Sequence, residues 1–487
     1  MSTFYIKTNR IFSPIRKYGW IFTLLVAIGG LWYPKLGLLV IPVMVSLTTL
    51  AFFKGRYWCG NFCPHGSFFD SFLDKVSQNR KIPVFFKSKL TFSLFFLYFA
   101  FNLGNKFFRV SKIWGTVSFW DRLGFIFVAS YLMVVVVGGL LSLFISQRTW
   151  CNICPMGTLQ RISYKAGKFI GVTKKTDEKI TIASEEMCHT CGKCARVCPM
   201  QLTPYTDFSN KNQFDHEACI RCSTCVENCP AGVLSLVNEE TALNIKEETS
   251  TEGYEDRHII TAVIEDIEGL GQNTSEYTFR FKKPERVDYK AGQFILVKIQ
   301  NDPIMYRAYS ISSFNEDGTS LSVTIKRVPD GYGTGIIFDS FKVGDTVTLE
   351  GPMGNELLVD KNAEKVLFVA GGIGITPFVP MVQDVIENEN NHNNVKLIYG
   401  VNYEKDFMYD EHFSEMERLS ENIDYIKVAA FDDEWEGEKG FVTDVMKNMN
   451  LEGYKIYMCG PKPMIDATMA TLDQMGVKKE DIFFESA

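Results

Sequence analysis

Histidine is scarce in this chain of 487 residues: there are six, and His65 is the only one before residue 188. A b-type haem held by two histidines is therefore excluded from this first part of the chain. Positive charge is not in excess either, since the formal net charge is −6. A nucleic-acid partner, which would need a basic face, is not expected.

Charged residues are absent from four long apolar runs, at residues 18–33, 36–53, 90–104 and 123–145. Runs of about 20 apolar residues predict membrane-spanning helices, so we expect four spans in contact with the lipid bilayer. Because no acidic side chain lies inside them, the spans offer no proton or sodium relay. No small-residue cleavage site follows the first run, which indicates a retained span rather than a signal peptide.

The basic residues between the apolar runs predict how the chain crosses the membrane. Lys and Arg are frequent before residue 18, between residues 54 and 89, and after residue 147, and cytoplasmic loops carry such residues in excess. These segments should face the cytoplasm, in a multi-pass protein of the cytoplasmic membrane. The connector with Lys106, Arg109, Lys112 and Arg122 departs from this rule.

Eight of the 13 cysteines form two runs of the pattern C-x2-C-x2-C-x3-C-P. Each [4Fe-4S] cluster takes four thiolates, and in this pattern the fourth cysteine of each run ligates the other cluster. Zinc or disulfides are the alternatives, but zinc sites lack the doubled runs with a trailing proline. The segment resembles the bacterial two-cluster ferredoxins. We assign Cys188, Cys191, Cys194 and Cys229 to one cluster, and Cys219, Cys222, Cys225 and Cys198 to the other.

A related pair of cysteine motifs follows the second and fourth apolar runs. Residues 56–67 read R-Y-W-C-G-N-F-C-P-H-G-S, and residues 148–158 read R-T-W-C-N-I-C-P-M-G-T. A helix pair used twice predicts a two-fold arrangement in which four thiols meet at the cytoplasmic interface and hold one further iron–sulfur cluster. Unmetallated cysteine pairs or transient dithiols are the alternatives.

The first 178 residues resemble the polytopic membrane ferredoxins of nitrate and nitrous-oxide respiration, whose paired cysteine-proline motifs precede a two-cluster ferredoxin. The resemblance implies Cys59, Cys63, Cys151 and Cys154 as the ligands of the membrane cluster. The two-residue gap between Cys151 and Cys154 departs from the three-residue gap of that family.

The second half of the chain begins after an acidic stretch at residues 241–256, which predicts a solvated tether. Short β-branched runs then predict a small antiparallel barrel. On one of its strands Arg307, Tyr309 and Ser310 could grip a phosphate, stack on an isoalloxazine and hydrogen-bond its reactive edge, although this motif alone could be ordinary strand chemistry. A glycine-rich turn at residues 331–335 opens a helix at 336–341 and would take the pyrophosphate. The predicted strands are residues 259–267, 277–281, 293–299, 320–328 and 346–350.

The last part alternates strands and helices, which predicts a parallel sheet covered on both faces. Its first strand leads into G-G-I-G-I-T-P at residues 371–377, where glycines let backbone amides approach a pyrophosphate. The turn C-G-P at residues 459–461 closes a later strand at the same edge. The predicted strands are residues 365–370, 395–400, 425–430 and 455–458, and the helices are residues 376–387, 410–419, 441–449 and 462–475.

Residues 258–487 resemble the ferredoxin-NADP reductase superfamily. The resemblance implies FAD on the barrel and a nicotinamide dinucleotide on the sheet, with Ser310, Cys459 and Glu485 as catalytic residues of hydride transfer. A buried core thiol is the alternative for Cys459. The implied FAD ligands are Arg307, Tyr309, Ser310, Gly331 and Thr334, and the implied dinucleotide ligands are Gly371, Gly372, Gly374, Thr376, Cys459, Gly460 and Pro461.

Acidic residues at Asp432, Asp433 and Glu434 follow the strand at residues 425–430, where NADP-using relatives place Ser and Arg for the 2′-phosphate. Acidic side chains would repel that phosphate, so NADH is favoured over NADPH.

Five segments follow from these patterns: a transmembrane iron–sulfur domain (1–178), a two-cluster ferredoxin domain (179–240), an acidic linker (241–256), an FAD-binding barrel (257–357) and an NAD-binding α/β domain (358–487). Such a chain would pass electrons from NADH through FAD and the clusters to a quinone or an extracytosolic redox protein. The alternatives are a membrane-anchored NAD(P)H:ferredoxin reductase acting on soluble ferredoxin in either direction, and a redox-sensing iron–sulfur membrane protein.

Overall fold

The computed structural model describes residues 4–255, 257–271, 273–313, 317–360, 362–387 and 394–486. The chain forms two compact units. The first contains the described residues up to 188 together with 192–250, and the second contains residues 189–191 and the described residues from 251 onward.

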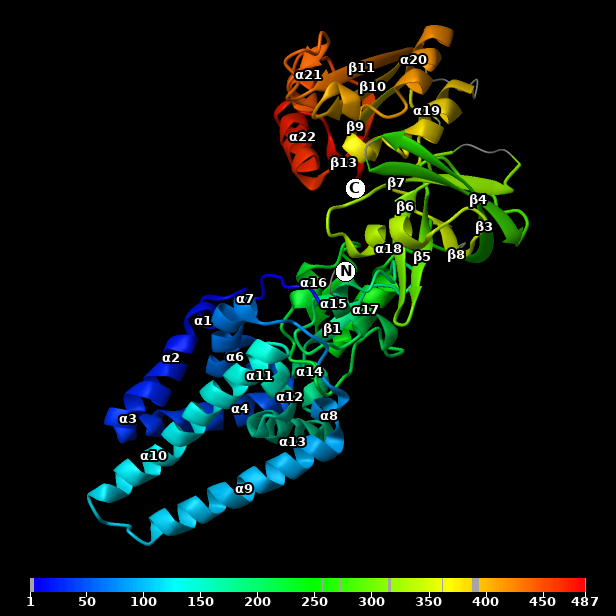
Figure 1. Cartoon of the computed structure of the whole chain (residues 1–487). Coiled ribbons are helices and arrows are strands. Elements are labelled where there is room, and N and C mark those ends of the chain that lie inside the picture. The colour runs from blue at the N-terminus through cyan, green and yellow to red at the C-terminus, as the bar shows by residue number, and fades with distance from the viewer. Residues whose placement is uncertain are drawn as a thin grey trace. The chain divides into compact units, whose positions relative to one another are not determined.

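The first unit begins with a helical region that holds both W-C motifs (Figure 1). Besides the long helices α4, α9, α10 and α13 it contains short helices, two of which, α1 and α6, begin at a proline. The helices are α1 (Pro14–Tyr18), α2 (Trp20–Leu24), α3 (Gly30–Trp32), α4 (Val40–Lys54), α5 (Tyr57–Asn61), α6 (Pro64–Phe68), α7 (Asp74–Val76), α8 (Val84–Lys87), α9 (Lys89–Ser111), α10 (Ser118–Met133), α11 (Gly139–Phe144), α12 (Thr149–Ile153), α13 (Pro155–Ile170) and α14 (Thr173–Thr176).

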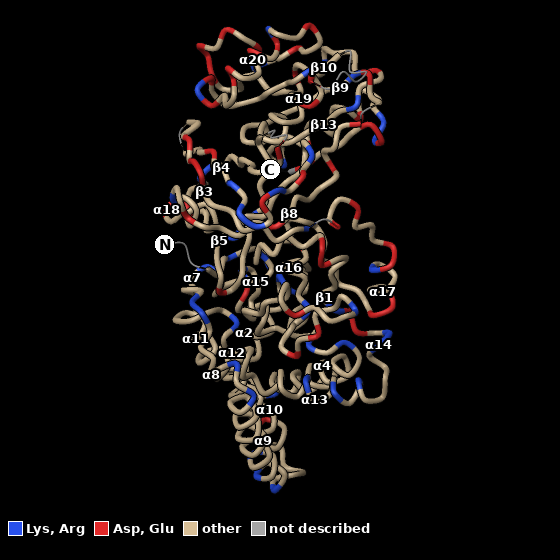
Figure 2. Tube along the Cα trace, turned by 90° about the vertical axis from the view of Figure 1, so that its right-hand side faces the viewer, with Lys and Arg blue, Asp and Glu red and all other residues tan. Residues whose placement is uncertain are grey.

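Two helical stretches, Pro34–Lys54 and Ser118–Phe144, are long and apolar enough to cross a membrane. The first joins a 3-10 turn to α4, and the second runs from α10 through a π turn to α11. Only 22% and 33% of their most apolar windows are buried, so most residues of these windows are at least partly exposed. Figure 2 shows that charged residues along the α9–α10 hairpin gather toward its two ends.

The other two predicted spans, residues 18–33 and 90–104, do not pass the same test among the described residues. Residues 18–33 are divided between the end of α1, α2, a π turn and α3. Helix α9 is long enough at 23 residues, but it carries Asn102, Asn105 and Lys106 in its second half.

The ferredoxin region completes the first unit. Strands β1 (Lys179–Ile182) and β2 (Leu234–Val237) pair antiparallel, and the short helices α15 (Lys193–Arg196) and α16 (Thr224–Glu227) lie within the two cysteine runs. Gly192 (φ 68°) and Ser223 (φ 58°) occupy equivalent positions after the second cysteine of each run. The left-handed backbone there turns the chain, so that the second and third thiols of each run are presented from one tight loop.

The acidic stretch that the sequence predicts as a solvated tether is partly ordered, so this prediction is wrong in part. Helix α17 (Glu239–Glu248) begins at Asn238, whose Oδ1 accepts a hydrogen bond from the Thr241 amide at 2.9 Å. The cap and the two acidic residues of the first turn favour a helix N-terminus, which outweighs the missing periodicity. Further on, the buried Tyr254 donates its hydroxyl to Glu356 at 2.9 Å. Asp256 lies outside the described residues.

The second unit contains the predicted barrel. Six antiparallel strands follow the order β6-β5-β8-β3-β4-β7, and helix α18 (Tyr332–Ser340) follows β7. The strands are β3 (His258–Gly271), β4 (Thr274–Lys283), β5 (Phe294–Asn301), β6 (Ile304–Ser310), β7 (Ser320–Lys326) and β8 (Thr346–Met353).

A parallel sheet follows, in the order β12-β11-β10-β9-β13-β14. Helices α19 (Phe378–Glu387) and α20 (Asp410–Leu419) pack on one face, and α21 (Val442–Met446) and α22 (Lys462–Gln474) pack on the other (Figure 1). The predicted alternation of strands and helices is confirmed. The strands are β9 (Lys365–Gly371), β10 (Asn394–Val401), β11 (Ile423–Ala429), β12 (Glu438–Lys439), β13 (Tyr454–Gly460) and β14 (Ile482–Ser486).

Candidate functional site

The two W-C motifs of the helical region bring their four thiols to one cavity. Cys59 lies on α5 and Cys151 on α12, while Cys63 and Cys154 immediately precede the prolines that begin α6 and α13. All four cysteines line a cavity of about 110 Å³, as the predicted two-fold arrangement requires. The other lining side chains are mainly apolar residues of α4, α9 and α10, with His65 and Tyr131 among them.

The surroundings of these four cysteines suit ligands of an iron–sulfur cluster better than they suit thiolates without metal. Burial, followed by repulsion from Cys151 and Cys59, raises the pKa of Cys154 to about 12. Burial and the same neighbours also raise the pKa of Cys63. Thiolates in this cavity therefore need additional positive charge, which the irons of a cluster would supply.

The second predicted ferredoxin set also meets at one cavity. Cys198, Cys219, Cys222 and Cys225 line a space of about 20 Å³, although Cys198 comes from the other run. Burial and then the charge of Cys222 raise the pKa of Cys198 to about 12. The exchange of the fourth cysteine between runs is thus present in the fold.

In the first set, Cys194 belongs to a buried hydrophobic cluster of the ferredoxin region, and Cys188 and Cys229 pack against that cluster. Cys191, the fourth member, falls within the second unit. Among the described residues no three His, Cys, Asp or Glu side chains are grouped as a single metal ion would need.

The helical thiols and the ferredoxin thiols lie close together within the first unit. Cys59 and Cys151 share one hydrophobic cluster with Cys222, and Cys154 and Cys198 pack against it. The backbones almost touch at Gly60, where an added Cβ would lie 2.1 Å from the carbonyl oxygen of Ile220.

Polar contacts hold the same ferredoxin loop against the helices. The Asn61 amide donates to the Arg221 carbonyl at 3.1 Å. The Arg221 side chain, 5% exposed, forms two hydrogen bonds of 2.7 and 2.8 Å with Asp177, which also accepts the Tyr164 hydroxyl at 2.6 Å. Because Arg221 precedes Cys222, this buried ion pair positions a predicted cluster ligand.

The predicted flavin residues lie on β6 and at the start of α18. Arg307, Tyr309 and Ser310 are half-buried on β6, which pairs with β5. The Arg307 side chain packs on the glycine turn, since a Cβ on Gly333 would lie 2.5 Å from its Nε. The Thr334 hydroxyl accepts the Val328 amide at 3.2 Å and closes this turn. A guanidinium at a helix N-terminus can bind a phosphate, so the arrangement suits a flavin dinucleotide.

A cavity of about 690 Å³ opens at the carboxyl edge of the parallel sheet. Gly371, Gly372 and Pro461, three of the predicted dinucleotide ligands, line it. Gly374 does not line it but lies beneath it, where an added Cβ would be 2.2 Å from the Cys459 carbonyl oxygen. Thr376 and Gly460 are buried beside this turn.

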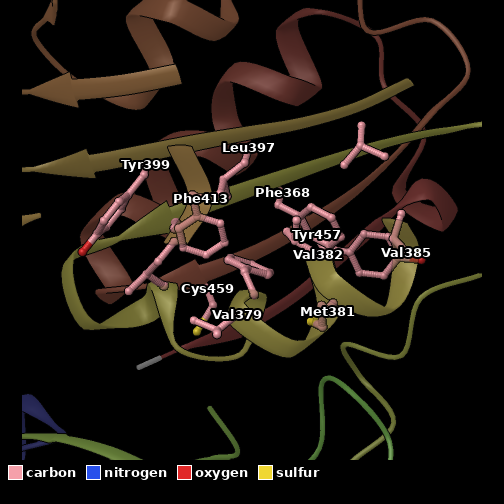
Figure 3. Close-up of a cluster of buried hydrophobic side chains, with 14 of the residues drawn as sticks. Phe368, Val379, Met381, Val382, Val385, Leu397, Tyr399, Phe413, Tyr457 and Cys459 are labelled. Atoms are coloured by element: carbon pink, nitrogen blue, oxygen red, sulfur yellow. The ribbon is translucent and has the colours of Figure 1, made fainter. Parts of the chain in front are cut away.

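Cys459 and Glu485 are brought side by side by the pairing of β13 with β14. The Cys459 side chain is 2% exposed and belongs to the core beneath α19 (Figure 3). Burial and then the charge of Glu485 raise the pKa of the Cys459 thiol well above its usual value. Burial, followed by the charge of Glu356, raises the pKa of Glu485 to about 7. Near pH 7 the Glu485 carboxyl is therefore expected to be about half protonated, and the Cys459 thiol is expected to stay neutral.

Comparison with protein families assigns most of the chain. An oxidoreductase FAD-binding domain matches residues 261–356, and an oxidoreductase NAD-binding domain matches residues 368–470. A 4Fe-4S dicluster domain matches residues 180–230, and a 4Fe-4S binding domain matches residues 36–83 and again residues 128–173. The chain is a flavin/iron–sulfur NAD(P)H oxidoreductase. In this oxidoreductase, FAD- and NAD-binding domains of the ferredoxin-NADP reductase type follow a 4Fe-4S ferredoxin domain.

Several relatives are reductase components. The toluate 1,2-dioxygenase electron transfer component of Pseudomonas putida is 28% identical over 46% of this oxidoreductase and 66% of the relative. The phenol 2-monooxygenase reductase component of Pseudomonas sp. (strain CF600) is 32% identical over 40% of this chain and 57% of the relative. The chain thus spans less than two thirds of both. Among solved structures, a ferredoxin reductase in carbazole 1,9a-dioxygenase is 28% identical over 47% of this chain and 69% of that one, with a TM-score of 0.42.

Sequence reasoning did not single out the charged residues around the helical thiols. Arg56 and Arg148 are each 1% exposed, and Asp70 is 7% exposed. Both arginines stand three residues before a cysteine in the repeated motif, so their repetition was the available signal. The dinucleotide cavity also includes Lys326 and Phe441, for which the sequence offered no motif.

Proposed function

We propose that the chain is a membrane-bound, NADH-dependent oxidoreductase that passes electrons through FAD and the ferredoxin clusters to a cluster held by the helical thiols, and onward to a quinone or an extracytosolic redox protein. The relatives are named as electron transfer and reductase components, which supports the direction from NADH to iron–sulfur clusters. When bound, FAD would accept a hydride and release single electrons, which the clusters carry one at a time.

The observation that carries the proposal is the shared hydrophobic cluster of Cys59, Cys151 and Cys222. Thiols of the helical repeat and of the second ferredoxin set are close neighbours within one compact unit. A tether that served only to anchor a soluble reductase would not need this proximity. With a quinone as acceptor the balance is NADH, one proton and quinone giving NAD⁺ and quinol.

The buried guanidinium of Arg56 supports a cluster among the helical thiols. Its Nε has no hydrogen-bond partner, and Arg56 forms no ion pair within the part of the chain that the structure describes. An uncompensated buried cation costs several kcal/mol, whereas a thiolate-ligated cluster with net negative charge would balance it. Cys59, Cys63, Cys151 and Cys154 would be its ligands.

Membrane insertion is supported by the exposed apolar surface of the helical region. On α9, Leu97, Tyr98 and Phe101 are between 63% and 70% exposed, and on α4 Val45 is 61% exposed. Such surface needs an apolar covering, and a bilayer in which residues 18–33 and 90–104 also cross would supply it. The cytoplasmic membrane, with the cofactor domains in the cytoplasm, agrees with the placement of basic residues.

A quinone acceptor is supported by two side chains on the wall of the cavity that the cluster would fill. Its wall is mainly apolar, but it includes His65 and Tyr131, whose ring centroids lie 4.3 Å apart. The His65 Nδ1 atom is buried and has no hydrogen-bond partner among the described residues. A quinone offers an apolar ring and carbonyl oxygens that such groups could bind.

Preference for NADH is supported by the acidic turn after β11. Asp432 accepts the Glu404 amide at 2.9 Å and the Glu434 amide at 3.2 Å, so its carboxylate is held in this turn. The neighbouring Ala430 and Asp406 line the dinucleotide cavity. A 2′-phosphate at that edge would meet negative charge.

The test is anaerobic purification of the full chain in detergent, with iron, sulfide and FAD counted per chain. Three [4Fe-4S] clusters correspond to about twelve irons with one FAD, whereas about eight would leave the helical thiols without metal. Replacing both Cys59 and Cys151 by Ala should remove about four irons and abolish quinone reduction while NADH still reduces FAD. Replacing Cys219 and Cys222 instead should remove ferredoxin iron and also stop quinone reduction. If the Cys59 and Cys151 variant reduces quinone as the wild type does, electrons leave from the ferredoxin clusters and the proposal is wrong.

A further inference from the structure

The two W-C motifs exchange their arginines across the cavity that holds the four thiols. Arg56, from the first motif, donates from Nη2 to the carbonyl oxygen of Cys151 in the second motif at 2.9 Å. Arg148, from the second motif, donates from Nη1 to the carbonyl oxygen of Cys59 in the first motif at 3.3 Å. Each guanidinium also approaches the thiol of its own motif, at 3.8 Å from Arg56 to Cys59 and 3.6 Å from Arg148 to Cys151.

Two glycines make this exchange possible. An added Cβ on Gly66 would lie 2.6 Å from Nη1 of Arg148, and one on Gly157 would lie 3.0 Å from Nη2 of Arg56. Each glycine is the third residue after the second cysteine of its motif. The glycine of each motif therefore leaves room for the guanidinium of the opposite motif. The two arginines lie at equivalent places beside the thiols.

The charges around these equivalent arginines are nevertheless different. Arg148 forms hydrogen bonds of 3.0 and 2.6 Å with Asp70, and Arg16 shares the same carboxylate at 2.6 Å. Burial alone would raise the pKa of Asp70, but the two guanidiniums hold it well below its usual range, so this carboxylate stays charged.

Among the residues that the structure describes, no carboxylate forms a hydrogen bond or an ion pair with Arg56. Asp70 is the seventh residue after Cys63, and the seventh residue after Cys154 is Arg161. Burial and then the charge of Arg56 lower the pKa of Arg161 to about 10, which reflects two cations on this side of the cavity. Arg148 thus has a buried carboxylate partner, whereas Arg56 lies beside a second cation and also donates to the Ala218 carbonyl oxygen of the ferredoxin region at 3.4 Å.

We propose that Arg56 is a positioning residue that raises the reduction potential of the cluster among the helical thiols, and that Asp70 offsets the same effect of Arg148. The inference rests on the proposed function, because it needs a cluster at Cys59, Cys63, Cys151 and Cys154. Reduction adds one negative charge to that cluster, and a fixed buried cation stabilises the reduced form more than the oxidised form. The ferredoxin clusters then deliver electrons downhill to this site.

The experiment is an anaerobic redox titration of the full chain in detergent, in which the electron paramagnetic resonance signal of this cluster is followed. Arg56→Gln should make its midpoint potential more negative by at least about 59 mV, a tenfold change in the reduced-to-oxidised ratio. Asp70→Asn should shift the potential in the positive direction because the negative charge that offsets Arg148 is removed. Arg56→Lys keeps the charge and should restore most of the wild-type value.

A matched control is Lys54→Gln, which removes a cation two residues before Arg56. Lys54 is 29% exposed and paired with Glu178, so solvent screens it and the potential should not change. Shifts of the same sign in the Arg56→Gln and Asp70→Asn variants would indicate general loosening and overturn the inference. If Arg56→Gln loses its iron, Asp70→Asn decides, and an unchanged or lower potential overturns the inference. A wild-type chain with only about eight irons would instead refute the proposed cluster itself.

Discussion

The close contact between Gly60 and Ile220 yields a sharp test of electron flow between the ferredoxin and helical regions. A Cβ at position 60 would lie 2.1 Å from the Ile220 carbonyl oxygen and 3.2 Å from the Cα of Cys222. Both contacts are with backbone, which cannot rotate away as a side chain can. In Gly60→Ala the two segments must separate by about 1 Å, which moves a predicted ligand of one cluster away from Cys59.

The expected magnitude follows from overpacking at a tightly fitted contact. Forcing one methyl group into such a contact costs about 1–3 kcal/mol. If that energy opposes docking of the ferredoxin loop on α5, the docked population falls relative to the undocked one by about fivefold to 150-fold, since about 1.4 kcal/mol is a factor of ten. Electron transfer to the helical cluster should slow accordingly.

The assay is rapid mixing of the reduced full chain with a membrane acceptor, together with iron counting to verify that all clusters are retained. Gly104→Ala is the matched control, because nothing lies within 4 Å of a Cβ at that helical position. Reduction of FAD by NADH should be unchanged in both variants. If Gly60→Ala, with full iron content, transfers electrons to the membrane acceptor as fast as Gly104→Ala, then this contact is not part of the electron path.

Three further predictions follow from buried or repulsive charges. Asp177→Asn leaves the buried Arg221 guanidinium without its partner and should destabilise the docked ferredoxin loop by about 3–5 kcal/mol. The measurement is amide hydrogen exchange, which should become faster in that loop. The control Lys168→Gln removes an exposed ion pair and should change the exchange little. Glu485 has a pKa of about 7, above the ordinary 4.5, so its protonated form favours the folded state. That contribution is present below the ordinary pKa and is lost as pH rises through about 7. The melting temperature of the full chain should therefore fall as the pH is raised from about 5 to about 8. Glu485→Gln should make this fall smaller. Equal pH dependence in both proteins would contradict the assignment. Replacing Asp432 by Ser and Asp433 by Arg should raise kcat/KM for NADPH relative to NADH at least about tenfold in a dye-reduction assay, and an unchanged ratio would show that this turn does not read the 2′-phosphate.

Local patterns were enough to predict the cofactor-binding modules of this protein. The doubled cysteine runs with their trailing prolines predicted a two-cluster ferredoxin, and the family match over residues 180–230 agrees. Alternation of strands and helices predicted the parallel sheet, with β9 leading into Gly371 as expected. Such signals are readable because ligand spacing and backbone periodicity depend on neighbours in the chain.

Elements that depend on capping or on pairing at the chain end were missed. Helix α17 begins at a single Asn cap within an acidic stretch, and strand β14 exists only because β13 offers its edge to residues near Glu485. The periodicity of a short segment shows neither where a side chain caps a helix nor which distant strand it pairs with. All four apolar runs were likewise predicted as spans, and their composition alone did not show that residues 18–33 are divided among short helices, unlike the long stretch Ser118–Phe144.

The sequence by itself determined which kinds of residue are candidate ligands: soft thiolates in repeated motifs, glycines at sheet edges and an arginine before each helical cysteine pair. Only the tertiary structure decided that Arg56 and Arg148 cross to the opposite motif, and that Asp70 pairs with Arg148 and not with Arg56. Charge balance at a buried site depends on which side chains meet in space, and residues 70 and 148 meet through packing that no local spacing encodes.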